Sequence, residues 1–104
     1  MPRPTTVRGV LLAAARLIER RGWGRHRLED DQGRLCVAGA INVAVRGSSV
    51  HFWRPARRAA LADRALCRLD DRLGGDAIRW NNSPTRTQAE VVTALRAAAK
   101  GAPR

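Results

Sequence analysis

The most distinctive chemical feature of this sequence is a row of arginines in its second half. Placed on a helix at about 100° per residue, four of them share a sector of roughly 80° opposite a leucine-rich face: Arg57, Arg64, Arg68 and Arg72. Like charges four residues apart cost an isolated helix roughly 0.2–0.5 kcal/mol per pair. The row therefore predicts an anionic partner, and the alternative is a solvated face whose repulsion is screened by salt.

Guanidinium groups in such a row can bind phosphates, so the leading hypothesis is an accessory protein that engages DNA or RNA through the phosphate backbone. The candidate contacts are Arg54, Arg57, Arg58, Arg64, Arg68 and Arg72. Binding of this kind weakens steeply with salt and has low sequence specificity. The second hypothesis is a protein-interaction or regulatory module for an acidic protein surface, with electrostatics setting the association rate and the choice of partner.

Two segments mix aromatic and basic residues: 20–27 and 51–58. Exposed indoles beside arginines can stack on bases while the arginines bind phosphates. Trp23 and Trp53 are nevertheless expected to be core or core-edge residues, because a small domain has few other large side chains to bury. The sequence has no zinc-ligand spacing, leucine zipper or glycine-rich phosphate loop, and a helix-turn-helix is neither identified nor excluded.

The third hypothesis is an enzyme that uses Cys36 as its nucleophile. Cys36 lies near the start of an expected helix, where the helix terminus would lower the pKa of a thiol. His26 or His51 would act as the base. Asn81 or Asn82 would orient that base. No diagnostic motif accompanies these residues, so a buried structural cysteine is the default expectation.

No metal and no other cofactor is expected. Glu29, Asp30 and Asp31 offer enough carboxylates to suggest a metal site, but a solvated acidic turn is the stronger interpretation. The two cysteines, Cys36 and Cys67, lack metal-ligand spacing. They are expected to be reduced thiols.

The composition indicates one small and strongly basic domain. The chain has 104 residues, a mass of 11.4 kDa and a net charge of +11, and its 44% of hydrophobic residues make it too apolar for a disordered tail. We expect a single domain over residues 1–104 with an ordered core at about 5–100. No run approaches the roughly 20 apolar residues of a membrane span. No secretory signal is recognised, so a cytoplasmic location is expected.

Hydrophobic periodicity predicts a mainly α-helical, compact bundle of about four helices. The expected helices cover about 6–21, 35–45, 55–73 and 87–100. The second of them is compatible with a strand, but its alanines and glycine favour a buried helix. Thr87 and Glu90 form a capping box before the last helix. Residues 30–33 indicate a turn. A short β-hairpin between the first two helices is compatible with this turn. Residues 78–80 are expected to be extended.

Two motifs resemble a family of small uncharacterised bacterial domains. The first is GRxCxxGA at 33–40, and the second is WNNxPxRTxxEV at 80–91. Members of this family also carry Gly-Trp after the first helix, as Gly22 and Trp23 do here. The resemblance spans most of the chain and implies a common compact fold, but it implies no activity.

The second motif also has a physical interpretation of its own. Its residues indicate a tryptophan anchor, a turn, a proline and then a capped helix. The family usually shows Asp at the position of Asn82. Arg86 is expected to pair with an acid such as Asp30 or Asp31.

Overall fold

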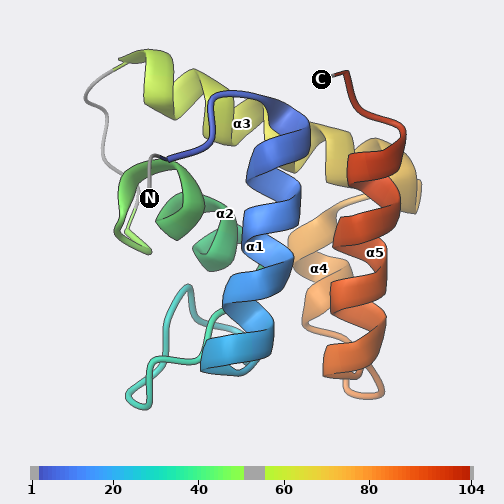
Figure 1. Cartoon of the computed structure of the whole chain (residues 1–104). Helices are drawn as coiled ribbons and strands as arrows, with labels where there is room; N and C mark the ends of the chain where they lie inside the picture. The colour runs from blue at the N-terminus through green and yellow to red at the C-terminus, as the bar shows by residue number, and fades with distance from the viewer. Residues whose placement is uncertain (1–2, 51–55, 104) are drawn as a thin grey trace.

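The computed structural model describes residues 3–50 and 56–103, which form five helices (Figure 1). The helices are α1 (Val7–Arg21), α2 (Val37–Arg46), α3 (Ala56–Leu73), α4 (Ala77–Asn81) and α5 (Gln88–Lys100). The prediction of a mainly helical, compact fold is therefore confirmed, with four long helices and one short one. Within the described ranges, no helix combines the length and the hydropathy needed to cross a bilayer.

Helix α1 lies at the centre of the bundle and packs against α5, α2 and α3. In Figure 1, α2 and α5 lie on either side of α1, and α3 runs across one end. The largest fully buried apolar side chains are Leu11, Ile18, Leu35, Ile41, Leu69, Leu95, Val10, Val37, Val45 and Val91. Trp23 and Trp80 are half-buried and pack against the edge of this core. The core-edge prediction is thus confirmed for Trp23, and Trp53 lies outside the described residues.

Side-chain caps begin the first and last helices, and the capping box of the last helix confirms the prediction from the sequence. The Thr6 hydroxyl accepts a hydrogen bond from the N–H of Gly9 at 3.0 Å. In the capping box of α5, the Thr87 hydroxyl accepts from the N–H of Glu90, and the Glu90 carboxylate accepts from the N–H of Thr87. These contacts satisfy N–H groups that a helix cannot satisfy within itself.

The short helix α4 corrects the prediction of an extended segment at 78–80. Its start is capped by Asp76, which accepts hydrogen bonds from the N–H groups of the second and third helical residues at 2.9 and 3.1 Å. Asp70, near the end of α3, accepts from the N–H of Ala77 at 2.7 Å. Two carboxylates therefore stabilise a helix that is too short to show hydrophobic periodicity.

Residues 22–36 connect α1 to α2 without a β-hairpin, which corrects that part of the prediction. Leu35 forms isolated bridges with Trp23 and Glu29, and the described residues contain no strand. Each bridge involves a single residue pair, so the hydrogen bonds do not continue into a ladder. The turn is instead closed by Asp30, whose Oδ1 accepts from the backbone two and four residues further on.

This connection approaches the start of α2 very closely. The Cys36 sulfur caps the helix by accepting a hydrogen bond from the N–H of Gly39 at 3.4 Å. The N–H of Cys36 donates to the carbonyl of Leu28 at 3.3 Å. A methyl group at Gly39 would collide with that same carbonyl. Glycine is therefore required at position 39 by the proximity of another backbone segment.

Replacing Gly39 with alanine should destabilise the protein, although alanine is the better helix former by about 1 kcal/mol. The new methyl group meets the Leu28 carbonyl, so we expect a net loss of roughly 1–3 kcal/mol in the free energy of unfolding. Chemical denaturation followed by circular dichroism measures this loss. Gly75→Ala is the control, because nothing lies within 4 Å of a methyl group at that position. Equal stability of Gly39→Ala and the parent would contradict the close-approach argument.

Candidate nucleic-acid interface

Helix α3 carries the predicted arginine row on its outer face. The inner face is apolar, and its buried residues are Leu61, Ala62, Ala65 and Leu69. In the row itself, Arg57, Arg64 and Arg72 are exposed and Arg68 is half-buried. The amphipathic pattern therefore fixes which side of α3 the arginines occupy, because burying the leucines turns them outward.

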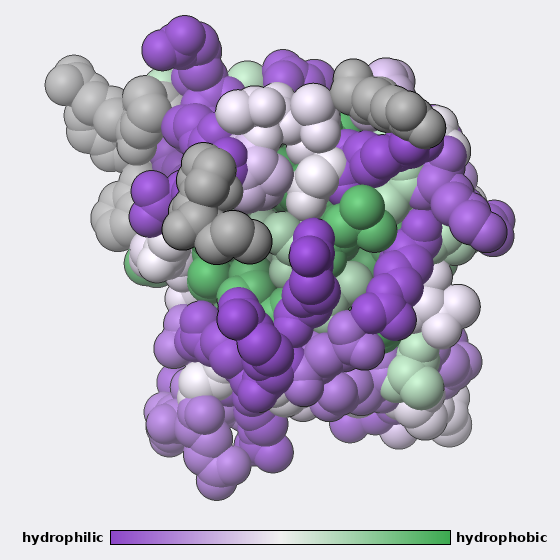
Figure 2. Space-filling model, viewed as in Figure 1, coloured by the Kyte–Doolittle hydropathy of each residue, from purple (hydrophilic) through white to green (hydrophobic). Residues whose placement is uncertain are grey.

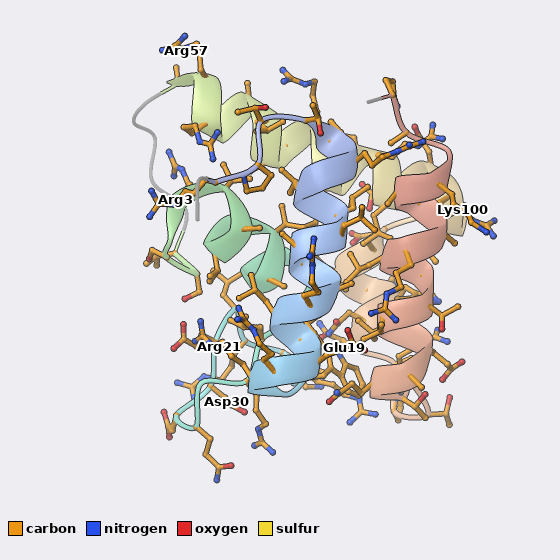
Figure 3. All side chains as sticks on the ribbon, in the orientation of Figure 1. Arg3, Glu19, Arg21, Asp30, Arg57 and Lys100 are labelled. Carbon is orange, nitrogen blue, oxygen red and sulfur yellow. The ribbon has the colours of Figure 1, made fainter. Side chains whose placement is uncertain are left out.

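The guanidinium groups of this row form no ion pair within the described part of the chain, whereas five ion pairs join arginines to acids elsewhere in it. The acids of α3 neutralise the row only in part. Asp70 is directed to the start of α4, and Asp63 and Asp71 form no ion pair with the row. Figure 3 shows Arg57 at the outer start of α3, far from the labelled Glu19 and Asp30. The excess positive charge therefore remains on this face.

Arg58 has a structural role that separates it from the other candidate contacts. Its Nε and Nη2 donate to the carbonyl of Val45 at 3.0 and 2.6 Å, and its Nη1 donates to the carbonyl of Pro4 at 3.0 Å. The guanidinium thus satisfies a carbonyl at the end of α2 and joins α3 to the segment before α1. Arg54, the remaining predicted contact, lies outside the described residues.

Arg64 and Arg68 line a hollow of about 570 Å³ between α3, the start of α1 and the C-terminal segment. The Arg68 guanidinium lies against Gly101, and its Nε is buried with no hydrogen-bond partner among the described residues. Because this Nε is out of contact with solvent, a phosphate would reach Arg68 through its Nη groups. Asp63 and Asp71 also line the hollow, and they reduce its positive potential.

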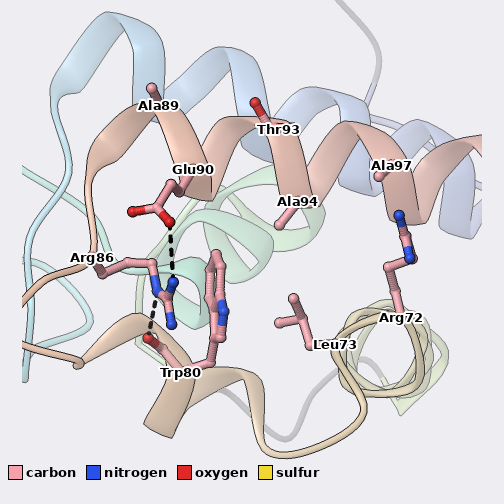
Figure 4. A pocket seen from close by; sticks show the side chains of 9 residues that line it. All are labelled: Arg72, Leu73, Trp80, Arg86, Ala89, Glu90, Thr93, Ala94 and Ala97. Carbon is pink, nitrogen blue, oxygen red and sulfur yellow. Dashed lines mark hydrogen bonds and ion pairs between the residues drawn. The ribbon is translucent and has the colours of Figure 1, made fainter.

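Arg72 lies at one end of a second hollow, of about 550 Å³, and Arg86 lies at the other end (Figure 4). Arg86 stacks over the Trp80 ring at 4.0 Å, donates from Nε to the Trp80 carbonyl at 3.1 Å and pairs with Glu90 at 3.3 Å. Its ion-pair partner is therefore Glu90, which corrects the expectation of a pair with Asp30 or Asp31.

The side-chain amide of Asn81 is fully buried and joins three segments of the chain. Its Oδ1 accepts from the indole N–H of Trp23 at 2.8 Å and from the N–H of Val37 at 3.1 Å. Its Nδ2 donates to the carbonyl of Gly24 and to Oδ1 of Asn82, both at 3.2 Å. Local sequence patterns do not reveal this role, because the distant partners of Asn81 lie more than 40 positions away in the chain.

The basic and aromatic residues that follow α1 bind one another. The Arg25 guanidinium lies 4.5 Å from the centre of the Trp23 ring. It also donates to the carbonyls of Ser83, Pro84 and Arg86 at 2.9, 3.2 and 2.6 Å. One face of the Trp23 indole is thereby covered, so this segment anchors the turn after α4 and presents no open stacking platform there.

Cys36 lies at the start of α2 as expected, but the predicted direction of its pKa is wrong. Burial raises the pKa of the thiol, and hydrogen bonds from nearby backbone N–H groups oppose this only in part. A protonated thiol is a poor nucleophile. The amide of Asn81, predicted to orient a base, is occupied by structural hydrogen bonds. His51 lies outside the described residues.

The acidic turn holds its carboxylates in ion pairs with different arginines. Glu29 pairs with Arg21 at 3.0 Å, Asp31 pairs with Arg27 at 3.4 Å, and Asp30 pairs with Arg34. Among the residues that the structure describes, no group of three metal-binding side chains is found. Burial raises the pKa of Asp30, but hydrogen bonds from Arg34 and Gln32 outweigh this effect, so the pKa lies below its ordinary value of 3.8.

These features define a small helical domain in which both sequence motifs have structural roles. The chain matches a family of unknown function (DUF6197) over residues 2–101, and it belongs to that family. The resemblance to an uncharacterised domain family is thus confirmed. No curated protein and no solved structure matches the chain.

The two neighbouring asparagines should respond differently to replacement by aspartate. Asn82→Asp should be tolerated, because Oδ1 of Asn82 accepts both of its hydrogen bonds, from the N–H of His26 and from Asn81. Asn81→Asp loses the donor to Gly24 and buries a charge, so we expect a loss of roughly 2–4 kcal/mol in the free energy of unfolding. Urea denaturation at pH 7 compares the two variants. Equal losses would contradict the assignment of Asn81 as the central contact.

Acid should weaken the fold through Asp30 and Glu90. Hydrogen bonds from the backbone and hydroxyl of Thr87 lower the pKa of Glu90 below its ordinary value of 4.5. Folding lowers the pKa of both carboxyl groups. The two carboxylates therefore contribute fully to the stability of the fold when the pH is above their ordinary pKa values. That contribution is lost as the pH falls through the lower pKa values of the folded state. We expect the thermal midpoint to fall between about pH 5 and pH 2. The fall should be smaller in the variant Asp30→Asn/Glu90→Gln, and superimposable profiles would contradict the prediction.

Proposed function

We propose that this protein binds nucleic acid through the phosphate backbone, with Arg57, Arg64, Arg68 and Arg72 as the contacts. The observation that carries the proposal is a row of guanidinium groups on one face of a rigid helix, without ion pairs in the described part of the chain. Like charges held in such a row repel one another. Phosphates relieve that repulsion, and their bound counterions are released. The proposal includes a cytoplasmic location for the protein.

The dimensions of the row suit contact along a phosphate backbone. Arg57 and Arg72 are separated by roughly 22 Å at 1.5 Å per residue. Phosphates of one DNA strand repeat about every 3.4 Å along the axis, so the row is long enough to contact several phosphates of one strand. Four contacts would give a slope of about −3 to −4 in a plot of log affinity against log salt. Phosphate contacts carry no sequence information directly, so the specificity should be low.

An acidic protein surface is the alternative partner of the same row. Its carboxylates complement the arginines by the same electrostatics and would affect mainly the association rate. Binding of an acidic protein surface would depend less steeply on salt than binding of nucleic acid, because a protein surface lacks the condensed counterions of a polyphosphate. The salt dependence of binding therefore distinguishes the two partners.

Reversing the charge of two exposed arginines should weaken nucleic-acid binding. For Arg64→Glu/Arg72→Glu, we expect the affinity for labelled duplex DNA and RNA to fall by about tenfold or more, and the salt slope to shrink by about two. Fluorescence anisotropy at several salt concentrations measures both quantities. Arg16→Glu/Arg20→Glu is the matched control, because it changes the net charge equally but lies on α1.

The control variant should lose no more than about threefold in affinity, through the weaker long-range field alone. Equal losses in the two double variants would show that binding follows total charge, and this would overturn the proposed role of α3. The absence of measurable binding by the parent protein at low salt would overturn the nucleic-acid proposal itself.

A further inference from the structure

A second basic surface lies between α1 and α2, and it was not anticipated from the sequence. Arg3, Arg16 and Arg20 line a groove of about 590 Å³. Apolar residues from both helices also line it: Ala13, Leu17, Val43 and Ala44. Figure 2 shows apolar surface exposed among strongly polar side chains on this face of the molecule. The groove therefore combines an apolar floor with a cationic rim.

The rim arginines have no carboxylate partner among the described residues. Glu19 also lines the groove, but it pairs with Arg96 of α5 at 2.5 Å. Arg16 and Arg20 are exposed and stand four residues apart on α1, so they repel each other. Carboxylates brought to this rim by a partner would relieve the repulsion.

The shape of the groove favours an elongated occupant. Its lining residues on α1 extend from Gly9 to Arg20, a distance of roughly 16 Å at 1.5 Å per residue. A volume of about 590 Å³ over that length is too narrow for a whole helix, which is about 10 Å wide. It suits one ridge of apolar side chains inserted between α1 and α2.

We propose that this groove binds an acidic amphipathic helix of a partner protein. The apolar ridge of the partner helix lies over Leu17 and Val43, and its glutamates or aspartates face the rim arginines, as in other helix-in-groove complexes. A second copy of this chain suits the rim less well than an acidic helix, because two chains of charge +11 repel each other. The inference concerns a different face from the arginine row of α3 and does not rest on nucleic-acid binding.

A helical peptide tests the proposal directly. The probe is a fluorescein-labelled peptide of four turns with leucines at helical spacing and glutamates on both flanks. A scrambled peptide of identical composition keeps the charge but loses the apolar ridge. Fluorescence anisotropy measures binding to the full chain, and circular dichroism confirms that each variant keeps its helices.

Two changes should weaken binding of the designed peptide by about tenfold or more. Arg16→Glu/Arg20→Glu reverses the charge of two of the three rim arginines. Ala13→Gln fills the apolar floor without changing the charge. Arg64→Glu/Arg72→Glu is the charge-matched control and should leave peptide binding within about threefold. A peptide with lysine in place of glutamate should regain affinity for Arg16→Glu/Arg20→Glu.

Three results would overturn the proposal. Equal binding of the designed and scrambled peptides would show attraction by charge alone. Equal losses in the two double variants would show that the groove has no particular role. Loss of DNA binding in Arg16→Glu/Arg20→Glu, with peptide binding unchanged, would assign the rim to nucleic acid instead.

Discussion

The connection between α1 and α2 depends on the buried amide of Asn81. The connection lacks a strand ladder. Its position is fixed by hydrogen bonds that the Asn81 side chain forms with the Trp23 indole, the Gly24 carbonyl and the first N–H of α2. An amide suits this role because it accepts and donates at once. A buried carboxylate could not donate, and an apolar side chain would leave several polar groups without partners.

The arginines of this protein differ in their physical roles. Arg8, Arg25, Arg58 and Arg86 donate to backbone carbonyls at helix ends and turns. A guanidinium suits these sites because its donors form a planar fork that one lysine ammonium cannot reproduce. A second group has no such partners among the described residues, and it is concentrated on α3 and around the α1–α2 groove. The net charge therefore overstates how many cations are available to a ligand.

Local signals in the sequence predicted the long helices well. Thr6 and the Thr87–Glu90 capping box act within three residues, and the periodicity of leucine and alanine determined the buried side of α3. Features that depend on distant partners were not predictable in the same way. Helix α4 is stabilised partly by Asp70 of α3, and in place of the expected hairpin Leu35 forms isolated bridges with two segments.

The candidate site shows the same division between local and distant causes. The exposure of Arg57, Arg64 and Arg72 follows from helical geometry, whereas the structural role of Arg58 depends on the end of α2. The raised pKa of Cys36 results from burial, which short-range sequence patterns do not report. The α1–α2 groove was missed because its arginines come from two separate segments, and its floor includes residues of α2.

The bond between the Trp23 indole and Asn81 gives the molecule a built-in spectroscopic marker. The indole nitrogen lies 2.8 Å from the buried Oδ1 of Asn81, and opening of this junction breaks the hydrogen bond and exposes the indole proton to exchange with solvent. Its magnetic resonance signal would therefore follow local opening of this junction separately from global unfolding. Motion at one junction of the bundle can be observed in this way without attaching a dye.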